Sequence, residues 1–251
     1  QASDNTAILV DGSGSLVPAN WVAFDVNSFA IRESGTGAYG RTWGSVGLCT
    51  GGGAWGDCNG LTQNVVRYDT PTFGGFSASA SWGEDDMWDV ALRYAGEFGG
   101  FKFAAAAAYN EITGNGFPNT IAGTVDRTEY FQVGAYLQHV PTGLFVYGAY
   151  GHNDLPDLNF ESDTYYVKAG LRQRWTPLGH TVLYGEYLNV EESSNSILDG
   201  NVDVWGLGIV QEIDNAAMSL WVSYRHLSYD EASGIPYEDF QYVKAGALIN
   251  F

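Results

Sequence analysis

The chain has 251 residues, of which 45% are hydrophobic and only 16% charged, and its 29 acidic and 11 basic side chains leave a net charge of −18. This composition excludes a disordered chain, which is poor in aromatic residues, and it argues against a nucleic-acid partner, whose phosphates attract clustered Lys and Arg. No run of 18 apolar residues occurs, so no transmembrane helix is predicted. No charged-then-apolar leader is present, so we expect any signal peptide to have been removed.

Residues 1–63 read poorly as regular secondary structure. Short apolar stretches such as TAILVDG and NWVAFDVNSFAIRES are interrupted by the glycine-rich runs GSGS, GTGAYG and TGGGAWGD. A connection of this length is usually functional or disordered, and its aromatic residues favour an ordered one. We therefore predict one long external loop region over residues 1–63, ahead of the first strand.

The two cysteines, Cys49 and Cys58, lie in this region with eight residues between them. The spacing predicts a small disulfide loop formed in an oxidising compartment. The rival hypothesis, a metal site, lacks the second pair of Cys or His ligands that zinc requires. The four histidines are scattered, and no GxSxG, HExxH, GxGxxG or P-loop motif occurs. We therefore expect no enzyme, no metal site and no cofactor.

From residue 64 onward the hydrophobic pattern repeats every two residues, as in a strand with one apolar and one polar face. In the stretch MWDVALRYA, Trp88, Val90 and Leu92 fall on one face, whereas Asp89 and Arg93 fall on the other. This alternation predicts eleven strands, over residues 64–73, 76–84, 87–98, 101–112, 128–140, 143–154, 163–177, 180–191, 202–214, 218–229 and 239–251.

The connections between these strands alternate in length. Short connections lie at residues 74–75, 99–100, 141–142, 178–179 and 215–217, and long polar ones at 113–127, 155–162, 192–201 and 230–238, with 85–86 as a short exception. Short periplasmic turns opposite longer external loops are typical of a transmembrane barrel, and many of the predicted strands are long enough to span a bilayer. Residues 64–251 are therefore predicted to form an all-β, antiparallel, up-and-down transmembrane β-barrel. A secreted β-sandwich would have no reason to place its short turns at one end.

Aromatic residues also gather at the predicted strand ends, where a membrane barrel carries its aromatic girdles. They are Phe98, Phe101, Tyr109, Tyr130, Trp175, Tyr229, Phe240 and Phe251.

Two stretches resemble a known family. NVVRYDTPTFGGFSASASWG resembles the segment that follows the constriction loop in trimeric Gram-negative general porins. AGALINF ends in Phe251, like the carboxy-terminal strand that the outer-membrane assembly machinery recognises in that family. The resemblance implies a 16-stranded barrel whose third external loop folds into the lumen. The predicted strands would be its C-terminal part, strands six to sixteen, and residues 1–63 would hold the inward-folded constriction loop.

The resemblance also implies a function. It is passive diffusion of small hydrophilic solutes and ions through a water-filled channel in the outer membrane of a Gram-negative bacterium. The channel would be a homotrimer in contact with lipid and lipopolysaccharide. A second hypothesis is a channel specific for sugars or organic acids, with lumen-facing rings at Tyr136, Tyr166, Tyr184 and Trp221. A third is a non-channel surface barrel such as an adhesin.

Strand parity places the basic residues. The polar face of the strands carries Arg67, Arg93, Lys102, Lys168, Arg172, Arg174, Arg225 and Lys244. A Lys or Arg facing lipid at mid-bilayer costs about 2–4 kcal/mol, so these side chains are predicted to face the lumen. The acid-rich external loops would concentrate cations at the mouth.

The resemblance implies that arginines of the wall face carboxylates of the constriction loop. On this basis Arg67 is the first candidate for the constriction, with Asp69 on the same face, and Arg93, Arg172 and Arg174 extend it. Asp25 and Glu33 are the favoured loop carboxylates, although both could be ordinary solvated loop residues. The other lumen-facing basic residues, predicted to line the wall, are Lys102, Lys168, Arg225 and Lys244.

Overall fold

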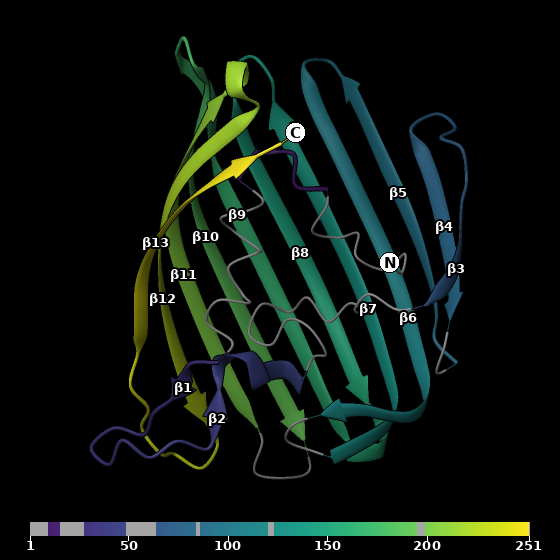
Figure 1. The fold of residues 1–251 in the computed structure, drawn as a ribbon, viewed down its shortest axis with the longest axis vertical. Coiled ribbons are helices and arrows are strands. Elements are labelled where there is room, and N and C mark those ends of the chain that lie inside the picture. The colour runs from purple at the N-terminus through teal and green to yellow at the C-terminus, as the bar shows by residue number, and fades with distance from the viewer. Residues whose placement is uncertain are drawn as a thin grey trace.

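The computed structural model describes residues 10–15, 28–48, 64–83, 86–119, 123–194 and 199–250. Eleven antiparallel strands form one sheet in which each strand pairs with the next along the chain, so the predicted strand number and the up-and-down order are confirmed. The strands are β3 (Val65–Asp69), β4 (Phe76–Gly83), β5 (Trp88–Phe98), β6 (Phe101–Asn119), β7 (Gly123–His139), β8 (Leu144–Leu155), β9 (Phe160–Thr176), β10 (Gly179–Ser194), β11 (Gly200–Ile213), β12 (Met218–Glu231) and β13 (Phe240–Ile249). The sheet curves around an interior, with β3 and β13 as its two edges (Figure 1).

Several strands are longer than predicted at the end of the sheet where the long connections lie. The predicted loop 113–127 is wrong, because β6 and β7 continue as a paired hairpin in which Thr113 faces Arg127 and Phe117 faces Val125. The prediction ended the strands where hydrophobic alternation stops. A hydrogen-bonded ladder needs no apolar face once it has left the bilayer, so the pairing continues in polar sequence.

Two of the short connections are tight glycine turns. Gly74 and Gly75 have φ values of 58° and 90°, and Gly99 and Gly100 have 59° and 83°. Positive φ at both turn residues matches the right-handed twist of the flanking strands, and glycine adopts it without strain. A short 3-10 turn also forms the short connection from β11 to β12, η5 (Asp214–Ala216), and another lies between β8 and β9 at the opposite end of the strands, η4 (Pro156–Leu158). No helix in the described ranges is long and apolar enough to cross a membrane.

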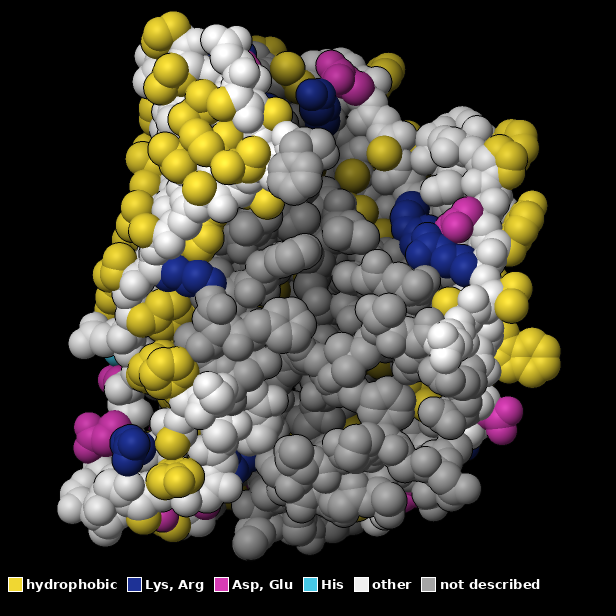
Figure 2. Space-filling view, viewed as in Figure 1, with side chains coloured by type: hydrophobic (Ala, Val, Ile, Leu, Met, Phe, Trp, Pro, Cys, Tyr) yellow, Lys and Arg dark blue, Asp and Glu magenta, His cyan; other side chains and the backbone are white. Residues whose placement is uncertain are grey.

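The two faces of the sheet differ as parity predicts. Along β5, Val90 and Leu92 are 45% and 53% exposed, whereas Asp89 and Ala91 are 1% and 5% exposed. Hydrophobic side chains follow the outer margins of the molecule in the space-filling view (Figure 2). The outer face is therefore apolar, and the charged positions of the strands turn inward.

The prediction of an aromatic girdle holds only in part. Phe98 and Trp175 are exposed near the short turns, but Tyr130 and Tyr229 are buried on the inner face. Phe240 also turns inward and packs against Phe29, with ring centroids 5.2 Å apart. Parity decides the face even at a strand end, so these three residues do not belong to the girdle.

Residues 28–48 lie inside the end of the sheet that carries the long connections (Figure 1). They form β1 (Ala30–Ile31), β2 (Arg41–Thr42) and η2 (Trp43–Leu48). One apolar cluster joins this segment to the inner face of β10, β11 and β12, and its members are Ile31, Trp43, Val46, Leu188, Val190, Val202, Val204, Leu227 and Tyr229. The segment is therefore packed onto the wall through a hydrophobic core of its own.

Candidate functional site: the interior of the sheet

Residues 10–15 contact the middle of the inner wall through an ion pair. The Lys168 ammonium of β9 binds the Asp11 carboxylate, and both side chains are fully buried. The ammonium also lies 5.8 Å from the ring centroid of Tyr147 and 5.5 Å from that of Tyr184. Such contacts attract a cation to the ring face. The ion pair and the two rings offset the free energy that the lysine loses when its ammonium leaves water.

Glycines let this segment approach the wall. A Cβ atom on Gly12 would lie 3.0 Å from the Tyr136 ring, and one on Gly14 would lie 2.5 Å from Glu212 Oε1. Gly14 also has a φ of 81°, which glycine adopts without strain. Within the segment, Ser13 and Ser15 share a hydroxyl hydrogen bond of 2.6 Å. The backbone of residues 12–14 therefore lies directly against the wall.

A second ion pair holds residues 28–48. Arg41 binds Glu192 of β10 in a bidentate manner with two 2.7 Å hydrogen bonds, and it donates a third of 3.0 Å to the Tyr229 hydroxyl. Burial alone would lower the pKa of Arg41, but the hydrogen bond and the charge of Glu192 raise it above its ordinary value. The guanidinium therefore stays charged inside the protein. Bidentate pairing also fixes its orientation.

The same carboxylate anchors the backbone of η2. Gly47 donates its amide to Glu192 Oε1 at 2.6 Å, and its carbonyl accepts from Asn153 at 3.0 Å and Ser162 at 3.1 Å. Three neighbouring strands, β8, β9 and β10, thus hold the backbone of Gly47. Glu192 falls in the predicted external connection 192–201, but the structure places it in β10, buried and paired with Arg41.

Other charges of the inner wall are paired within the wall itself. Arg225 of β12 binds Glu186 of β10 at 2.6 Å, and Arg172 of β9 binds Glu212 of β11 at 2.7 Å. Near the short turns, Arg174 pairs with Asp214. Each pair neutralises a basic side chain locally, so these residues do not present isolated positive charge to the interior.

A separate charged group lies on the strands nearest the β3 edge. Arg67 and Asp69 pair at 2.7 Å within β3, and Arg93 of β5 donates to the Ser79 hydroxyl at 2.8 Å. Both residues of the β3 pair are partly exposed. Lys and Arg side chains appear beside an acidic one at this side of the molecule in Figure 2. These strands lie at the opposite end of the sheet order from β9–β12.

The structure does not bring the predicted constriction residues into one place. Arg67, Asp69 and Arg93 form one group, whereas Arg172 and Arg174 lie on β9 toward the short turns. Glu33 lies at the end with the long connections, where its carboxylate accepts from Thr36 and its backbone pairs with Tyr237. The remaining predicted residues Asp25, Cys49, Cys58 and Phe251 lie outside the described residues.

The wall residues predicted from parity follow their strands. Lys168 and Arg225 are fully buried on the inner face, and Lys244 lies 5.4 Å from the Trp221 ring centroid. Lys102 has the same parity on β6 and is exposed close to the glycine turn at 99–100. In the described ranges no group of three or more His, Cys, Asp or Glu side chains is arranged to hold a metal ion.

Sequence reasoning did not select Asp11, Glu186 or Glu192. Asp11 was one of several loop carboxylates with nothing local to favour it. Parity could have identified Glu192, because the even-numbered positions of β10 face inward.

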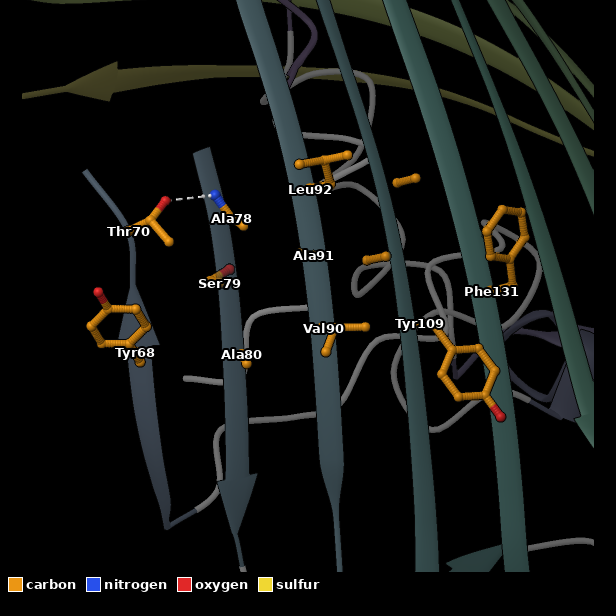
Figure 3. Close-up of a pocket in the computed structure, with 12 residues that line it drawn as sticks. Tyr68, Thr70, Ala78, Ser79, Ala80, Val90, Ala91, Leu92, Tyr109 and Phe131 are labelled. Atoms are coloured by element: carbon orange, nitrogen blue, oxygen red, sulfur yellow. Dashed lines mark hydrogen bonds between the residues drawn. The ribbon is translucent and has the colours of Figure 1, made fainter. Parts of the chain in front are cut away.

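The outer face carries an apolar hollow, of about 470 Å³, over β3 to β7 (Figure 3). Small side chains such as Ala78 and Ala80 form part of its lining, and larger ones such as Leu92, Tyr109 and Phe131 surround them. The hollow lies on the apolar side of the sheet, away from the charged interior. It is therefore not a site for a hydrophilic solute.

An up-and-down sheet with an apolar outer face and a charged inner face defines the wall of an outer-membrane-type β-barrel. The sequence matches the family model described as Gram-negative porin over residues 14–232. The chain therefore belongs to the Gram-negative porin family. It is an outer-membrane protein and not an enzyme, as the sequence predicted.

Two solved porin structures agree with the fold. The chain is similar to the anion-selective porin from Comamonas acidovorans, at 16% identity and a TM-score of 0.54 over 85% of this chain and 67% of that one. It is also similar to OmpF of Salmonella typhi in complex with daunomycin, at 16% identity and a TM-score of 0.51 over 90% and 71%. In vitro folded OmpT of Vibrio cholerae matches at 15% identity and a TM-score of 0.49 over 73% and 62%. The chain thus spans 62% to 71% of the length of these proteins. No curated protein sequence matches it.

Proposed function

We propose that the protein forms a water-filled channel for passive diffusion of small hydrophilic solutes and ions across the outer membrane. The observation that carries this proposal is the contrast between the two faces of one sheet, apolar outside and charged inside. Lipid requires an apolar surface, whereas a row of Lys, Arg, Asp and Glu along the inner face is stable only beside water or a paired charge. Family membership supports the same function.

The complete channel is proposed to be a closed barrel of sixteen strands, to which β3–β13 contribute the C-terminal eleven. Closure would satisfy the free backbone groups of β3 and β13, which lipid cannot do. We further propose that the barrel assembles as a homotrimer, contacts lipopolysaccharide and lipid at its outer face, and is delivered by the barrel-assembly machinery through the Phe251 end.

Residues 10–15 and 28–48 are proposed to narrow the lumen as parts of the constriction region 1–63. Both contact the inner face of the sheet, which supports this role. Arg67, Asp69 and Arg93 would then face the narrowed passage from β3 and β5, with Asp25 and Glu33 as the proposed loop carboxylates. The disulfide between Cys49 and Cys58 would constrain the same region.

We propose a weak preference for cations. The basic residues of β9 and β12 are neutralised by carboxylates, so they contribute little to anion attraction. The net charge of −18 leaves an acidic surplus elsewhere, and an acidic mouth raises the local concentration of cations.

Single-channel recording in a planar bilayer under a KCl gradient tests this function. A large ohmic conductance with a reversal potential of cationic sign is expected. Replacing Arg67 by Glu should move the reversal potential further in the cationic direction, because it reverses a charge that faces the passage. Arg127→Glu is the matched control. Arg127 is exposed near the tip of the β6–β7 hairpin, outside the lumen, where it pairs with Glu111 and Glu129. No conductance, or equal shifts from both variants, would contradict the proposal.

A further inference from the structure

The permanent charges on the inner wall of β9–β12 occur in pairs. Each Lys or Arg described on these strands binds one carboxylate, and the pairs are Lys168–Asp11, Arg172–Glu212, Arg174–Asp214 and Arg225–Glu186. Residues of these types ordinarily keep their charges at neutral pH. The pairs therefore add no net charge to the lumen.

Of the four histidines, which all lie in the described ranges, His180 alone is on the inner face. On β10 it shares the parity of Val182 and Tyr184, which belong to the buried inner cluster. The other three pair across the ladders with exposed aromatic residues of the outer face, namely His139 with Phe101, His152 with Phe131 and His226 with Trp205. Because histidine ordinarily changes its charge between about pH 5 and 8, this one ring can alter the charge of the inner wall near neutral pH.

His180 adds a second basic group to one of the pairs. Its Nδ1 lies 3.4 Å from Glu212 Oε2, the oxygen that also accepts a 2.7 Å hydrogen bond from Arg172. The other charges at this turn, Arg174 and Asp214, pair with each other. The group formed by Arg172, Glu212 and His180 therefore has no net charge while the ring is neutral, and a charge of about +1 when the ring is protonated.

This group lies at the short-turn end of the lumen wall and is open to water. His180 follows the first residue of β10, directly after a short connection. The side chains of His180, Glu212 and Arg172 are 33%, 20% and 22% exposed, so water and dissolved ions reach them. Glu212 also lies against residues 10–15, since a Cβ atom on Gly14 would be 2.5 Å from its Oε1. A charge at His180 therefore acts on ions that pass beside this segment.

We propose that His180 is a selectivity-determining residue of the channel and makes its ion preference depend on pH. While the ring is neutral, the acidic surplus elsewhere in the chain sets a preference for cations. When the ring is protonated, a positive charge stands beside the passage, where it repels cations and attracts anions. The preference for cations therefore weakens as the pH falls. The proposal rests on the proposed channel, because selectivity requires that ions pass through the lumen.

Reversal potentials of the full chain in a planar bilayer, under a KCl gradient at about pH 8 and about pH 5, test this role. In the wild type, the ratio of cation to anion permeability should fall about two- to fivefold at the lower pH, the effect of one charge a few ångströms from an ion in water. His180→Gln should lose this fall, because the side chain can no longer gain a charge. His180→Lys should show the low ratio at both pH values, because its ammonium stays charged.

His152→Gln is the matched control. The His152 side chain is 35% exposed and lies 2.9 Å from the Asp163 carboxylate, but it belongs to the outer face. This variant should keep the response of the wild type. A full response in His180→Gln, or its loss in His152→Gln, overturns the proposal. Circular dichroism checks that each variant retains its strands.

NMR of isotope-labelled histidine rings in the wild type gives a readout that does not depend on conductance. The ring signal that is missing from His180→Gln should show a gain of a proton between about pH 8 and 5. A ring that keeps one charge state over this range overturns the proposal. A protein that conducts no KCl at either pH overturns the channel and this role together, whereas a conducting protein whose selectivity does not depend on His180 overturns this role alone.

Discussion

Residues 28–48 and residues 10–15 both lie against the inner wall, but different interactions hold them there. Residues 28–48 bury Ile31, Trp43 and Val46 in an apolar cluster and add several hydrogen bonds through Arg41 and Gly47. Residues 10–15 are held by one ion pair, by the partly buried Val10 packed against the wall, and by close backbone contact at glycines. Apolar burial cannot be replaced by a dissolved ion, whereas a carboxylate in an ion pair can.

The energies of the two attachments follow from this difference. A fully buried aromatic side chain contributes several kcal/mol through its removal from water and its packing. A buried ion pair gains less than its Coulomb attraction, because both ions lose their hydration. The longer segment is therefore expected to be the more firmly attached of the two.

The largest expected effect comes from removing the apolar anchor. Trp43 is fully buried between the segment and the wall. Trp43→Ala should destabilise the attachment of residues 28–48 by about 4 kcal/mol, the usual cost of truncating a buried aromatic residue. Limited proteolysis of the folded protein should then cut within this segment. Tyr39→Ala in the same segment is the control, because Tyr39 is 63% exposed and should leave cleavage unchanged.

Removing the charged anchor of the same segment should have the next largest effect. Glu192→Gln leaves the buried Arg41 without its counter-charge, which costs about 3 kcal/mol. It also weakens the acceptor of the Gly47 amide. Thermal unfolding in detergent should show a lower midpoint. Glu191→Gln is the matched control, because Glu191 is exposed on the other face of β10. Equal midpoints for the two variants would mean that Arg41 does not depend on Glu192.

The ion pair of the shorter segment should affect both stability and conductance. Asp11→Asn keeps the shape of the side chain but removes the charge that binds Lys168. Because the fully buried Lys168 ammonium then lacks its counter-charge, we expect about 3 kcal/mol of lost stability, as for Glu192→Gln. Single-channel recording should show a larger conductance than wild type. Asp199→Asn, in the external connection before β11, should leave the conductance unchanged.

The sequence predicts the strands well because lipid and water impose opposite demands on alternate residues. Parity placed Arg93, Lys168 and Arg225 on the inner face, where the structure has them. It did not predict the extension of β6 and β7 through 113–127, since strands beyond the bilayer are free of that demand.

The same reasoning could not predict which residues of the N-terminal region pair with which residues of the wall. Asp11 and Lys168 are 157 residues apart, and Arg41 and Glu192 are 151 apart. No periodic pattern relates such positions, so nothing in the sequence favours Asp11 over Asp25 as the partner of a wall residue. Only packing of the segment in three dimensions selects the pair.

The smallest effect is expected at the exposed pair of the short-turn end. Arg174 and Asp214 are 50% and 44% exposed, so water screens their attraction and already solvates both groups. Arg174→Gln should change stability by about 0–1 kcal/mol, the usual range for a surface ion pair. Arg172→Gln is the sharper comparison, because Arg172 and Glu212 are 22% and 20% exposed and Glu212 also contacts Gly14 of the shorter segment. If both segments are held as the structure has them, only the Arg172 variant should lower the midpoint of thermal unfolding in detergent clearly. An equal response from the two variants would mean that the Glu212 contact does not hold residues 10–15 in place.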